Sequence, residues 1–443
     1  MKSRPVAPRV PRVADAVVVG AGVVGTSIGF ELAKRGLRVV GVDKTGGPGL
    51  GSTSASSAIV RFNYSTEDGV AASWESKHCW EGWGAHLGLA DPPGLARFHR
   101  TGMVVLDSPA SPRERVISLF DKVGVPYEEW GADELRLRVP EVDVGRYWPP
   151  KRIDDDDFYA DPSGELGALY MPDAGFVDDP QLAAQNLAAA AVRHGVSYLF
   201  NREVVEVVRR RDRAAGVVLS DGARISAPVI VNAAGPWSGP LNRLAGVGSD
   251  FTIGVRPMRQ EVHRLAAAER EGPGGLHLPS IADLDLGFYG RPDLQGGFLV
   301  GGTEPACDPL HWLDDADELD PNVTSTCFLA QATRAAHRLG GLRIPVRPVG
   351  VAGVYDVSDD WAPIYDKTDL AGFYVAMGTS GNQFKNAPLV GRFLAEIVTR
   401  VEDGHDHDAD PINYAAEHTG VVIHLGAFSR RRPLKETSGT VMG

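Results

Sequence analysis

Four residues near the start of the chain have the types and the spacing needed to bind a dinucleotide. Gly20, Gly22 and Gly25 follow the G-x-G-x-x-G pattern, and Asp43 ends the next apolar run. The first glycine permits a tight turn, the second lets the backbone approach a pyrophosphate, and the third allows close packing of helix on strand. The Asp43 carboxylate can accept both ribose hydroxyls of an adenosine and would repel a 2′-phosphate, so the pattern disfavours NADP.

Two basic residues farther along could recognise an anion. Arg61 follows a Gly- and Ser-rich tract that begins at Thr45, whose small side chains let the backbone lie against a cofactor. An arginine directly beyond such a tract is a candidate for carboxylate recognition. Lys385 stands just before a helix that Pro388 opens, and the glycine loop 378–382 precedes it. The free N–H groups at such a helix start favour an anion nearby.

Alternating strands and helices must position these residues. The β-branched run 16–19, apolar residues at helical spacing up to Gly36, and a second buried strand at 37–42 form a complete βαβ unit. Further buried strands are expected at 229–231 and 373–376, and further helices at 74–87, 113–123, 180–194, 327–339 and from Pro388 onward. The sequence therefore predicts an α/β fold with a Rossmann-like, doubly wound domain.

Composition limits the classes of function. The chain has 443 residues, enough for two domains, and its net charge of −12 without a basic stripe argues against a nucleic-acid partner. No run approaches the roughly 18 apolar residues that span a bilayer. Cys79, Cys307 and Cys327 are too scattered for a disulfide framework or a zinc site, and no metal site is predicted. We therefore expect a cytoplasmic protein, with a loose tail at 1–13 and an exposed basic segment at 430–435.

Three separated tracts, in order, resemble one family of flavoproteins. They are GAGVVG with Asp43, VNAAGPW at 231–237, and GVYDVSDDWAPI at 353–364 followed by GTSGNQFKNAP at 378–388. Together they resemble the D-amino-acid-oxidase-like FAD-dependent oxidoreductases, and most closely the branch with sarcosine oxidase, dimethylglycine dehydrogenase and glycine oxidase. The resemblance runs from about Asp15 to Arg400.

The resemblance implies an FAD-binding domain built from discontinuous segments and a substrate domain with a mixed sheet. The FAD-binding domain would comprise 14–97, 161–246 and 349–402, and the substrate domain 98–160 and 247–348. Residues 403–443 lie largely outside the resemblance and are expected to form a C-terminal tail.

The resemblance also implies the site. Arg61 and Lys385 would hold a substrate carboxylate, and Tyr355 would lie beside the flavin. The motifs and the resemblance together assign the following residues to FAD binding: Gly20, Gly22, Val23, Val24, Gly25, Asp43, Lys44, Ser52, Thr53, Ser54, Val204, Ala234, Gly235, Trp237, Gly353, Gly378, Gly381, Asn382, Gln383 and Lys385.

The implied reaction is oxidation of the carbon–nitrogen bond of a small amino acid or N-alkyl amino acid. Hydride leaves the carbon beside a neutral amine for flavin N5, and water hydrolyses the imine. Two positions depart from the pattern. Gly353 stands where monomeric sarcosine oxidase has its flavin-tethering cysteine, and the loop 51–57 has no histidine, so FAD is predicted to be non-covalent. Leu299 stands where that enzyme has its oxygen-activating lysine, so two electron acceptors stay open, O2 and an electron-transfer partner.

Three alternatives remain at this stage. A hydroxy acid could replace the amine, and it would require a general base, for which His263 and His311 are available without a recognisable catalytic tract. The chain could instead be a non-catalytic, flavin-bearing subunit. A plain NAD dehydrogenase is disfavoured by the two later cofactor tracts.

Overall fold

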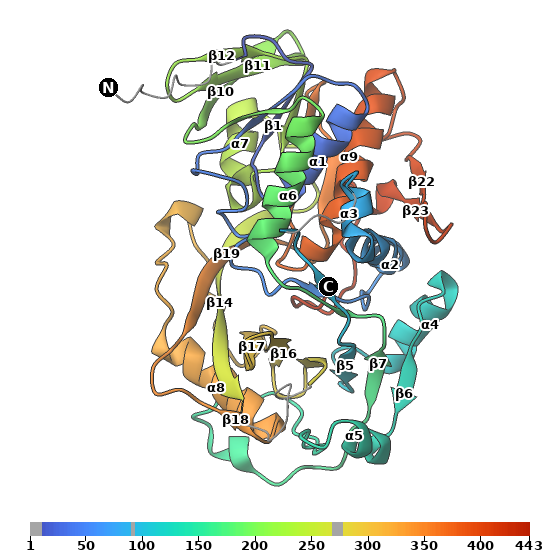
Figure 1. The fold of residues 1–443 in the computed structure, drawn as a ribbon, viewed down its shortest axis with the longest axis vertical. Helices are drawn as coiled ribbons and strands as arrows, with labels where there is room; N and C mark the ends of the chain where they lie inside the picture. Colours follow the sequence, from blue (N-terminus) through green and yellow to red (C-terminus); the bar gives the residue numbers. More distant parts are fainter. Residues whose placement is uncertain (1–10, 90–93, 268–277) are drawn as a thin grey trace.

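The computed structural model describes residues 11–89, 94–267 and 278–443, which form two halves stacked along the long axis of the molecule (Figure 1). The upper half in that view contains the N-terminal βαβ unit, and the lower half contains a large mixed sheet. The marker for the C-terminus lies between the two halves.

The upper half is organised around a six-stranded sheet in the order β20-β21-β13-β1-β2-β9. The predicted βαβ unit is present as β1 (Ala16–Val19), α1 (Val23–Lys34) and β2 (Val39–Val42). The other strands are β9 (Ser197–Leu199), β13 (Val229–Asn232), β20 (Ile364–Lys367) and β21 (Phe373–Met377). All neighbours pair in parallel except β20 with β21. The predicted α/β, Rossmann-like fold is confirmed, and its sheet draws strands from segments far apart in the chain.

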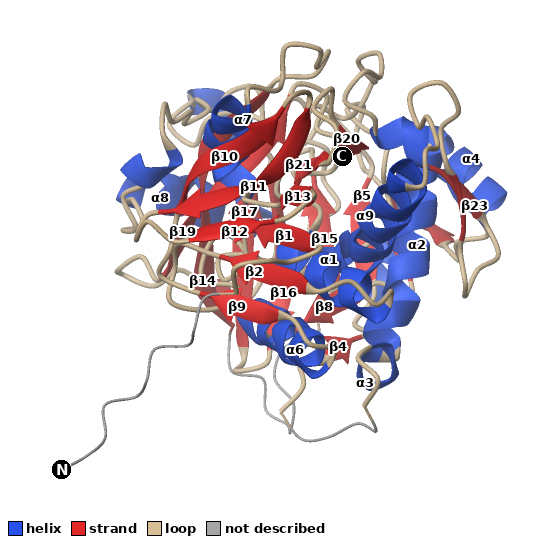
Figure 2. Cartoon of the chain, turned by 90° about the horizontal axis from the view of Figure 1, so that it is seen from above, coloured by secondary structure: helices blue, strands red, loops and turns tan. Residues whose placement is uncertain are grey.

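The two faces of this sheet are covered differently because successive strand residues point to opposite sides. Ala16 and Val18 of β1 pack in a core with helices α1, α6 (Pro180–Arg193) and α9 (Ala387–Glu402), which lie together on one side of the sheet (Figure 2). Val17 and Val19 pack in a second core beneath an antiparallel sheet and a short helix. These are β10 (Val204–Arg210), β11 (Arg213–Leu219), β12 (Arg224–Ser226) and α7 (Ser238–Ala245).

The lower half is built on a nine-stranded mixed sheet in the order β18-β14-β17-β16-β15-β5-β7-β6, with β19 also paired to β14. Its strands are β5 (Met103–Leu106), β6 (Glu128–Trp130), β7 (Ala168–Met171), β14 (Val255–Ala267), β15 (Ser280–Asp283), β16 (Phe288–Asp293), β17 (Gly297–Gly302), β18 (Leu342–Arg343) and β19 (Gly350–Ser358). Helix α8 (Ser325–Arg338) packs on this sheet and begins two residues before the predicted Cys327. Thr324 caps it by accepting a hydrogen bond from the Cys327 N–H.

Smaller elements join the halves. Helices α2 (Glu67–Glu81), α3 (Trp83–His86), α4 (Arg113–Val123) and α5 (Ala132–Arg138) accompany a three-stranded sheet of β3 (Ile59–Val60), β8 (Gly175–Val177) and β4 (Phe98–His99). Arg61 follows β3 directly, so this small sheet fixes where its side chain starts. Within the described residues, no helix is long and apolar enough to cross a bilayer.

The expectation that 430–435 is exposed is wrong for Arg430 and Arg432, whose side chains are 0% and 4% exposed. Arg431, Pro433 and Leu434 are exposed. Arg430 pairs with Asp366 (3.0 Å) and Asp408 (2.8 Å), and Arg432 donates two hydrogen bonds to the Asp360 carboxylate (2.7 and 3.0 Å). The segment after α9, which includes β22 (Asn413–Ala415) and β23 (Val422–His424), is thus packed against the upper half rather than loose.

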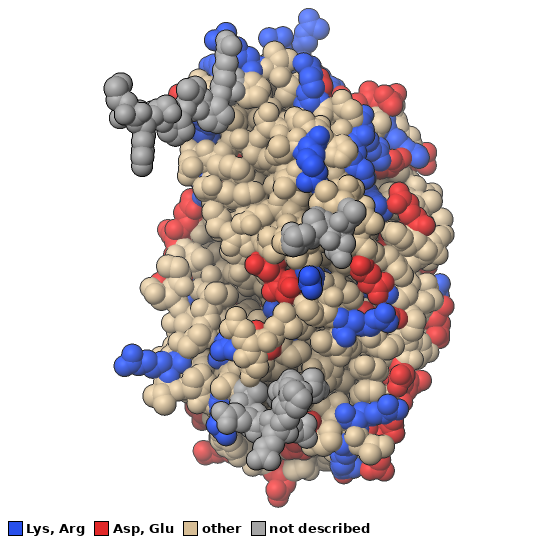
Figure 3. Space-filling view, in the orientation of Figure 1, with Lys and Arg blue, Asp and Glu red and all other residues tan. Residues whose placement is uncertain are grey.

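Charges on the surface are mixed. On the face drawn in Figure 3, the acidic and basic side chains of the described residues are interspersed, and they form no continuous basic stripe there.

Candidate functional site

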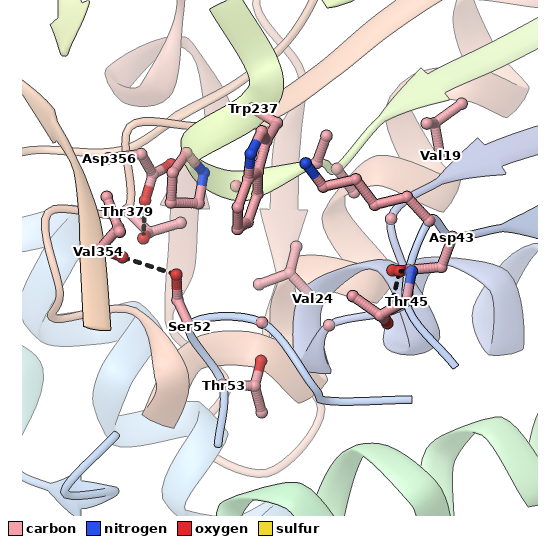
Figure 4. Close-up of a pocket in the computed structure, with 18 of the residues that line it drawn as sticks. Val19, Val24, Asp43, Thr45, Ser52, Thr53, Trp237, Val354, Asp356 and Thr379 are labelled. Carbon is pink, nitrogen blue, oxygen red and sulfur yellow. Dashed lines mark hydrogen bonds between the residues drawn. The ribbon is translucent and has the colours of Figure 1, made fainter. Parts of the chain in front are cut away.

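A long cavity runs along the carboxyl ends of β1, β2 and β13, the edge at which open α/β sheets bind ligands (Figure 4). Val19, Val42 and Ala233, which lie at or just beyond the ends of these three strands, line it. From there the cavity continues past Ser52 and Thr53 to Tyr355 and Gly381. We refer to it as the cofactor cavity.

The first glycine motif is required sterically. Gly20 has a φ of +106°, and a Cβ on it would lie 2.2 Å from the Ala233 carbonyl oxygen. A Cβ on Gly25 would lie 2.0 Å from the Gly20 carbonyl oxygen. Gly22 caps α1 without a side-chain hydrogen bond, and the helix start lies beside the cavity, where the Val23 N–H donates to the Thr53 hydroxyl (3.1 Å).

Asp43 is fixed at one end of the cavity. Its Oδ2 accepts a hydrogen bond from the Ala21 N–H (2.6 Å), and its Oδ1 accepts from the Thr45 N–H and hydroxyl (2.7 Å each), as Figure 4 shows in part. Next to it, the Lys44 ammonium lies 4.3 Å from the centre of the Trp237 ring. This end therefore combines an acceptor for hydroxyls with an aromatic surface.

Residues from the lower half that the sequence did not indicate also line this end. Asp317 forms an ion pair with Lys44 and accepts a hydrogen bond from Trp237 Nε1 (2.7 Å). Asp315 from the same loop, and Arg202 and Glu203 from the upper half, also line the cavity. No motif marks them, because the loop that carries Asp315 and Asp317 reaches the cavity only in the folded chain.

The opposite end of the cofactor cavity holds a buried acceptor. Ser52 Oγ donates to the Val354 carbonyl (2.6 Å), and the Thr379 hydroxyl donates to Asp356 Oδ1 (Figure 4). Asp356 Oδ2 is enclosed and has no hydrogen-bond partner within the described chain. Burial raises the pKa of Asp356. An unpartnered acceptor beside a cavity is suited to a donor on a bound ligand.

Fourteen of the residues predicted to bind FAD line this cavity: Gly20, Gly22, Val23, Val24, Asp43, Lys44, Ser52, Thr53, Val204, Ala234, Gly235, Trp237, Gly381 and Gln383. Gly25, Ser54, Gly353, Gly378, Asn382 and Lys385 are not part of its lining. Gly25 backs Gly20 instead, and Asn382 and Lys385 line a neighbouring cavity.

The cofactor cavity fits FAD. Its glycine cradle and helix start suit a pyrophosphate, Asp43 suits an adenosine ribose, and the enclosed Asp356 oxygen suits a donor at the far end. Gly353 leaves no space for a larger residue, because a Cβ there would lie 2.7 Å from the Ala55 Cβ.

A second, smaller cavity adjoins the first. Ser56, Ser57, Gly381 and Phe384 line both. The remaining lining residues of the second cavity are Ile59, Arg61, Met103, Tyr289, Asn382, Lys385, Val441 and Met442. We call it the substrate cavity. It receives residues from both halves of the molecule.

The structure brings Arg61 and Lys385 together at the substrate cavity. Arg61 is 4% exposed, and its Nη atoms donate to the carbonyls of Asn63 (2.5 Å) and Val441 (2.7 Å). Lys385 Nζ donates to the Tyr64 hydroxyl (3.0 Å) and the Asn382 carbonyl (2.6 Å). Both cations lie 5.1 Å from the centre of the Tyr64 ring.

The two cations differ electrostatically. Burial lowers the pKa of Arg61, but a guanidinium stays protonated. Burial, reinforced by the Arg61 charge, lowers the pKa of Lys385 well below its ordinary value. Within the described chain, neither residue has a carboxylate within ion-pair distance. Two buried basic groups thus surround the substrate cavity without a bound anion.

Tyr355 lines the cofactor cavity but not the substrate cavity. It is on β19, opposite Met258 of β14, and its ring would contact any Cβ on Gly381 at 2.2 Å. Its hydroxyl lies against that of Tyr289, a residue that the sequence did not indicate, and burial raises the pKa of both. Leu299, in β17, lines neither cavity.

The histidines considered for a hydroxy-acid mechanism do not line either cavity. His263 lies inside the lower half, where its Nδ1 contacts Gln331 Oε1 (2.8 Å) and its Nε2 lies 3.0 Å from Glu261. Glu261, His263 and Cys327 could geometrically hold a metal ion, but Glu261 is already engaged by Arg259 and Thr324.

Comparison with known proteins agrees with this geometry. The model of the family "FAD dependent oxidoreductase" (DAO) matches residues 15–397. Glycine oxidase of Geobacillus kaustophilus is 25% identical over 403 residues, which cover 88% of this chain and 94% of that protein. 4-Methylaminobutanoate oxidase (formaldehyde-forming) of Paenarthrobacter nicotinovorans is 25% identical over 429 residues, covering 94% of this chain and 47% of that protein.

Among solved structures, L-proline dehydrogenase from P. horikoshii superposes with a TM-score of 0.75 at 23% identity, covering 96% of this chain and 98% of that one. At this identity the likeness concerns the fold. The family match covers most of the chain, and it confirms the resemblance drawn from the three tracts. The chain therefore belongs to the FAD dependent oxidoreductase family, with FAD as its cofactor.

Proposed function

We propose that this protein oxidises the carbon–nitrogen bond of a small amino acid or N-alkyl amino acid. The observation that carries the proposal is Arg61, a buried guanidinium that lines the substrate cavity and has no carboxylate partner among the described residues. A buried cation without an opposite charge is costly, so it is retained where a ligand supplies the anion.

Arg61 binds and orients the substrate carboxylate. Its guanidinium can present two N–H groups to one carboxylate, which fixes direction as well as position. Lys385 provides the second contact. Because its pKa is low in the ligand-free site, it takes up a proton when an anion binds and thus adds its charge only with substrate present.

Bound FAD supplies hydride acceptance. The protein's own residues hold the reacting carbon next to the cofactor cavity, where Gly381 lines both sites and Tyr355 lines the cofactor side. Ile59, Met103 and Phe384 exclude water from the substrate cavity with apolar surface. The electrons then pass to O2 or to an electron-transfer partner.

An anaerobic absorbance titration of the purified holoprotein tests this function. Glycine, sarcosine, dimethylglycine, proline and D- and L-amino acids form one panel, and lactate, 2-hydroxyglutarate and glycerol 3-phosphate form the other. We expect one or more amines to bleach the oxidised-flavin band while the hydroxy acids leave it unchanged. Bleaching by hydroxy acids alone would establish the alcohol reaction, and a flavin that no compound reduces would favour a non-catalytic subunit.

A further inference from the structure

The segment Thr440–Gly443 enters the substrate cavity of its own chain. Val441 and Met442 are 6% and 3% exposed, and both line that cavity. The segment is a tight turn, because the Gly443 N–H donates to the Thr440 carbonyl (3.0 Å) and the Met442 N–H to the Thr440 hydroxyl (3.0 Å). We call residues 440–443 the plug.

The side chains of one acidic and one basic residue hold the main chain of a single plug residue. The Val441 N–H donates to Glu304 Oε2 (2.9 Å), and the Val441 carbonyl accepts from Arg61 Nη2 (2.7 Å). The nitrogen and the carbonyl of one residue are attached to the same Cα. Glu304 and Arg61 are therefore spaced to bind a nitrogen and a carboxyl carbon that share one carbon atom.

Glu304 has the features of a ligand-binding residue. It follows β17, in a loop where its φ is +50°, and this conformation is uncommon for a residue with a side chain. Its Oε1 is enclosed and has no hydrogen-bond partner within the described residues. Its charge contributes to the raised pKa of Tyr289 and of Tyr355, so it lies near these two tyrosines, and it reaches the substrate cavity through Val441 rather than as part of the cavity lining.

Resting on the function proposed above, we infer that the Val441 main chain occupies the place of an α-amino acid substrate, that Glu304 binds the substrate amine, and that Arg61 binds its carboxylate. The plug must then withdraw when substrate enters, because Glu304 and Arg61 cannot bind the Val441 main chain and the substrate at the same time.

The geometry of the Val441 main chain between Glu304 and Arg61 also defines the class of substrate. An α-amino acid matches the single carbon between the Val441 nitrogen and carbonyl, whereas β- and γ-amino acids separate amine and carboxylate by additional carbons. The Val441 nitrogen is bonded to the Thr440 carbonyl carbon, so the structure accommodates a substituent on that nitrogen. N-substituted α-amino acids, such as sarcosine and proline, are therefore the best-matched class.

The plug is held by contacts that can be exchanged for solvent or ligand. Outside the two main-chain bonds of Val441, the Ser65 hydroxyl donates to the Gly443 carbonyl (2.6 Å), and the Thr437 hydroxyl donates to the Asp360 carbonyl (2.9 Å). Neutral hydrogen bonds of this kind contribute roughly 1 kcal/mol each. Substrate binds only the molecules in which the plug is withdrawn. The apparent Kd is therefore the intrinsic Kd divided by the fraction of molecules in that state.

Hydrogen–deuterium exchange on the anaerobic, full-chain holoprotein tests withdrawal of the plug. Exchange in the peptide that covers 437–443 is compared without ligand, with sarcosine, with L-proline and with 4-aminobutanoate, and flavin absorbance is recorded in parallel. We expect about tenfold faster exchange with an α-amino acid and no change with 4-aminobutanoate.

The parallel readouts separate this inference from the proposed function. Flavin bleaching by an α-amino acid with unchanged exchange overturns the plug inference and leaves the function standing. Faster exchange without bleaching supports the plug inference and overturns the function. No response in either readout overturns both.

Substitutions then test the role of Glu304. Glu304→Ala removes the amine acceptor, so KM for the amino acid should rise about tenfold or more with a smaller change in kcat, whereas Glu304→Gln keeps an acceptor and should retain most of the affinity. Thr437→Val is the matched control: it loosens the plug without altering Glu304, so KM should fall or stay constant. A KM that rises in Thr437→Val, or stays at the wild-type value in Glu304→Ala, overturns the assignment.

Discussion

Replacing Arg61 by Met gives the sharpest test of the substrate cavity. Methionine keeps a long apolar stem but removes the guanidinium, whose two Nη atoms now contact the Asn63 and Val441 carbonyls. Truncating one partner of a buried, hydrogen-bonded charge pair costs about 2–5 kcal/mol. In this site one of the two contacts, to Asn63, is internal and stays in place when substrate binds, so the lower part of that range applies. We therefore expect kcat/KM to fall about 30- to 150-fold, which corresponds to roughly 2–3 kcal/mol.

The assay is steady-state kcat/KM with the amino acid that bleaches the flavin fastest, together with the FAD content of each variant. Arg61→Lys should lose less than Arg61→Met, because it keeps the charge but not the paired N–H groups. Arg100→Met, which removes an exposed partner of Asp173, is the control and should retain full activity. Wild-type kcat/KM in Arg61→Met, or an equal loss with an amine that has no carboxylate, would refute the assigned role.

Four further predictions concern the cofactor cavity, pH and the C-terminal segment. Gly25→Ala should lower FAD content and thermal stability, because its Cβ would lie 2.0 Å from a backbone oxygen. Gly131→Ala, with open space around its Cβ, is the control and should leave FAD content unchanged. Equal FAD content in the two variants would be inconsistent with the steric argument. Burial raises the pKa of Glu304 to about 8, so the folded protein binds a proton that the unfolded chain has lost, and stability falls as pH rises from about 5 to 8. In thermal melts the Tm of Glu304→Gln relative to that of wild type should therefore rise across that range. A constant difference in Tm would contradict the raised pKa. Arg432→Met leaves a buried aspartate unpaired and should cost about 3–5 kcal/mol in denaturant unfolding, against little change for the half-exposed Arg431→Met. Acid precipitation should release all yellow flavin into the supernatant, and a yellow pellet would show a covalent link.

Elements with strong local signals could be predicted from the sequence. Helix α4 spans the predicted 113–123 and ends at Gly124, whose φ is +82°. Helix α6 begins at the predicted Pro180 behind the Asp179 cap and ends one residue before the predicted His194. In both cases capping residues within a few positions of the helix determine its ends, so the information is local.

Other elements depend on distant partners. Helix α2 begins at Glu67 rather than near the predicted Trp74, and it is buried on most sides, so it shows no clear apolar stripe. The basic segment 430–435 looks exposed in the sequence because its carboxylate partners, Asp360, Asp366 and Asp408, precede it by many residues.

The same division holds for the site. The glycine motif and Asp43 carry their chemistry in short, ordered patterns, and Arg61, Lys385 and Tyr355 could be placed through the resemblance. Glu304 and Tyr289 have no pattern around them. Strand β16 carries Tyr289 into the lining of the substrate cavity, and Glu304, which follows β17, comes close to Tyr289 only in the folded chain.

The strand order of the upper sheet has a consequence for how the protein is made. β1 pairs with β13, so that Val17 lies beside Ile230, and β13 in turn pairs with β21 near residue 375. During translation β1, which is hydrophobic on both faces, and β13 stay incompletely paired until β21, late in the chain, has left the ribosome. Pairings at such sequence separation are slow and leave apolar edges open to aggregation. Recombinant yield should therefore depend on temperature and on chaperone supply, even though the finished fold encloses those edges completely.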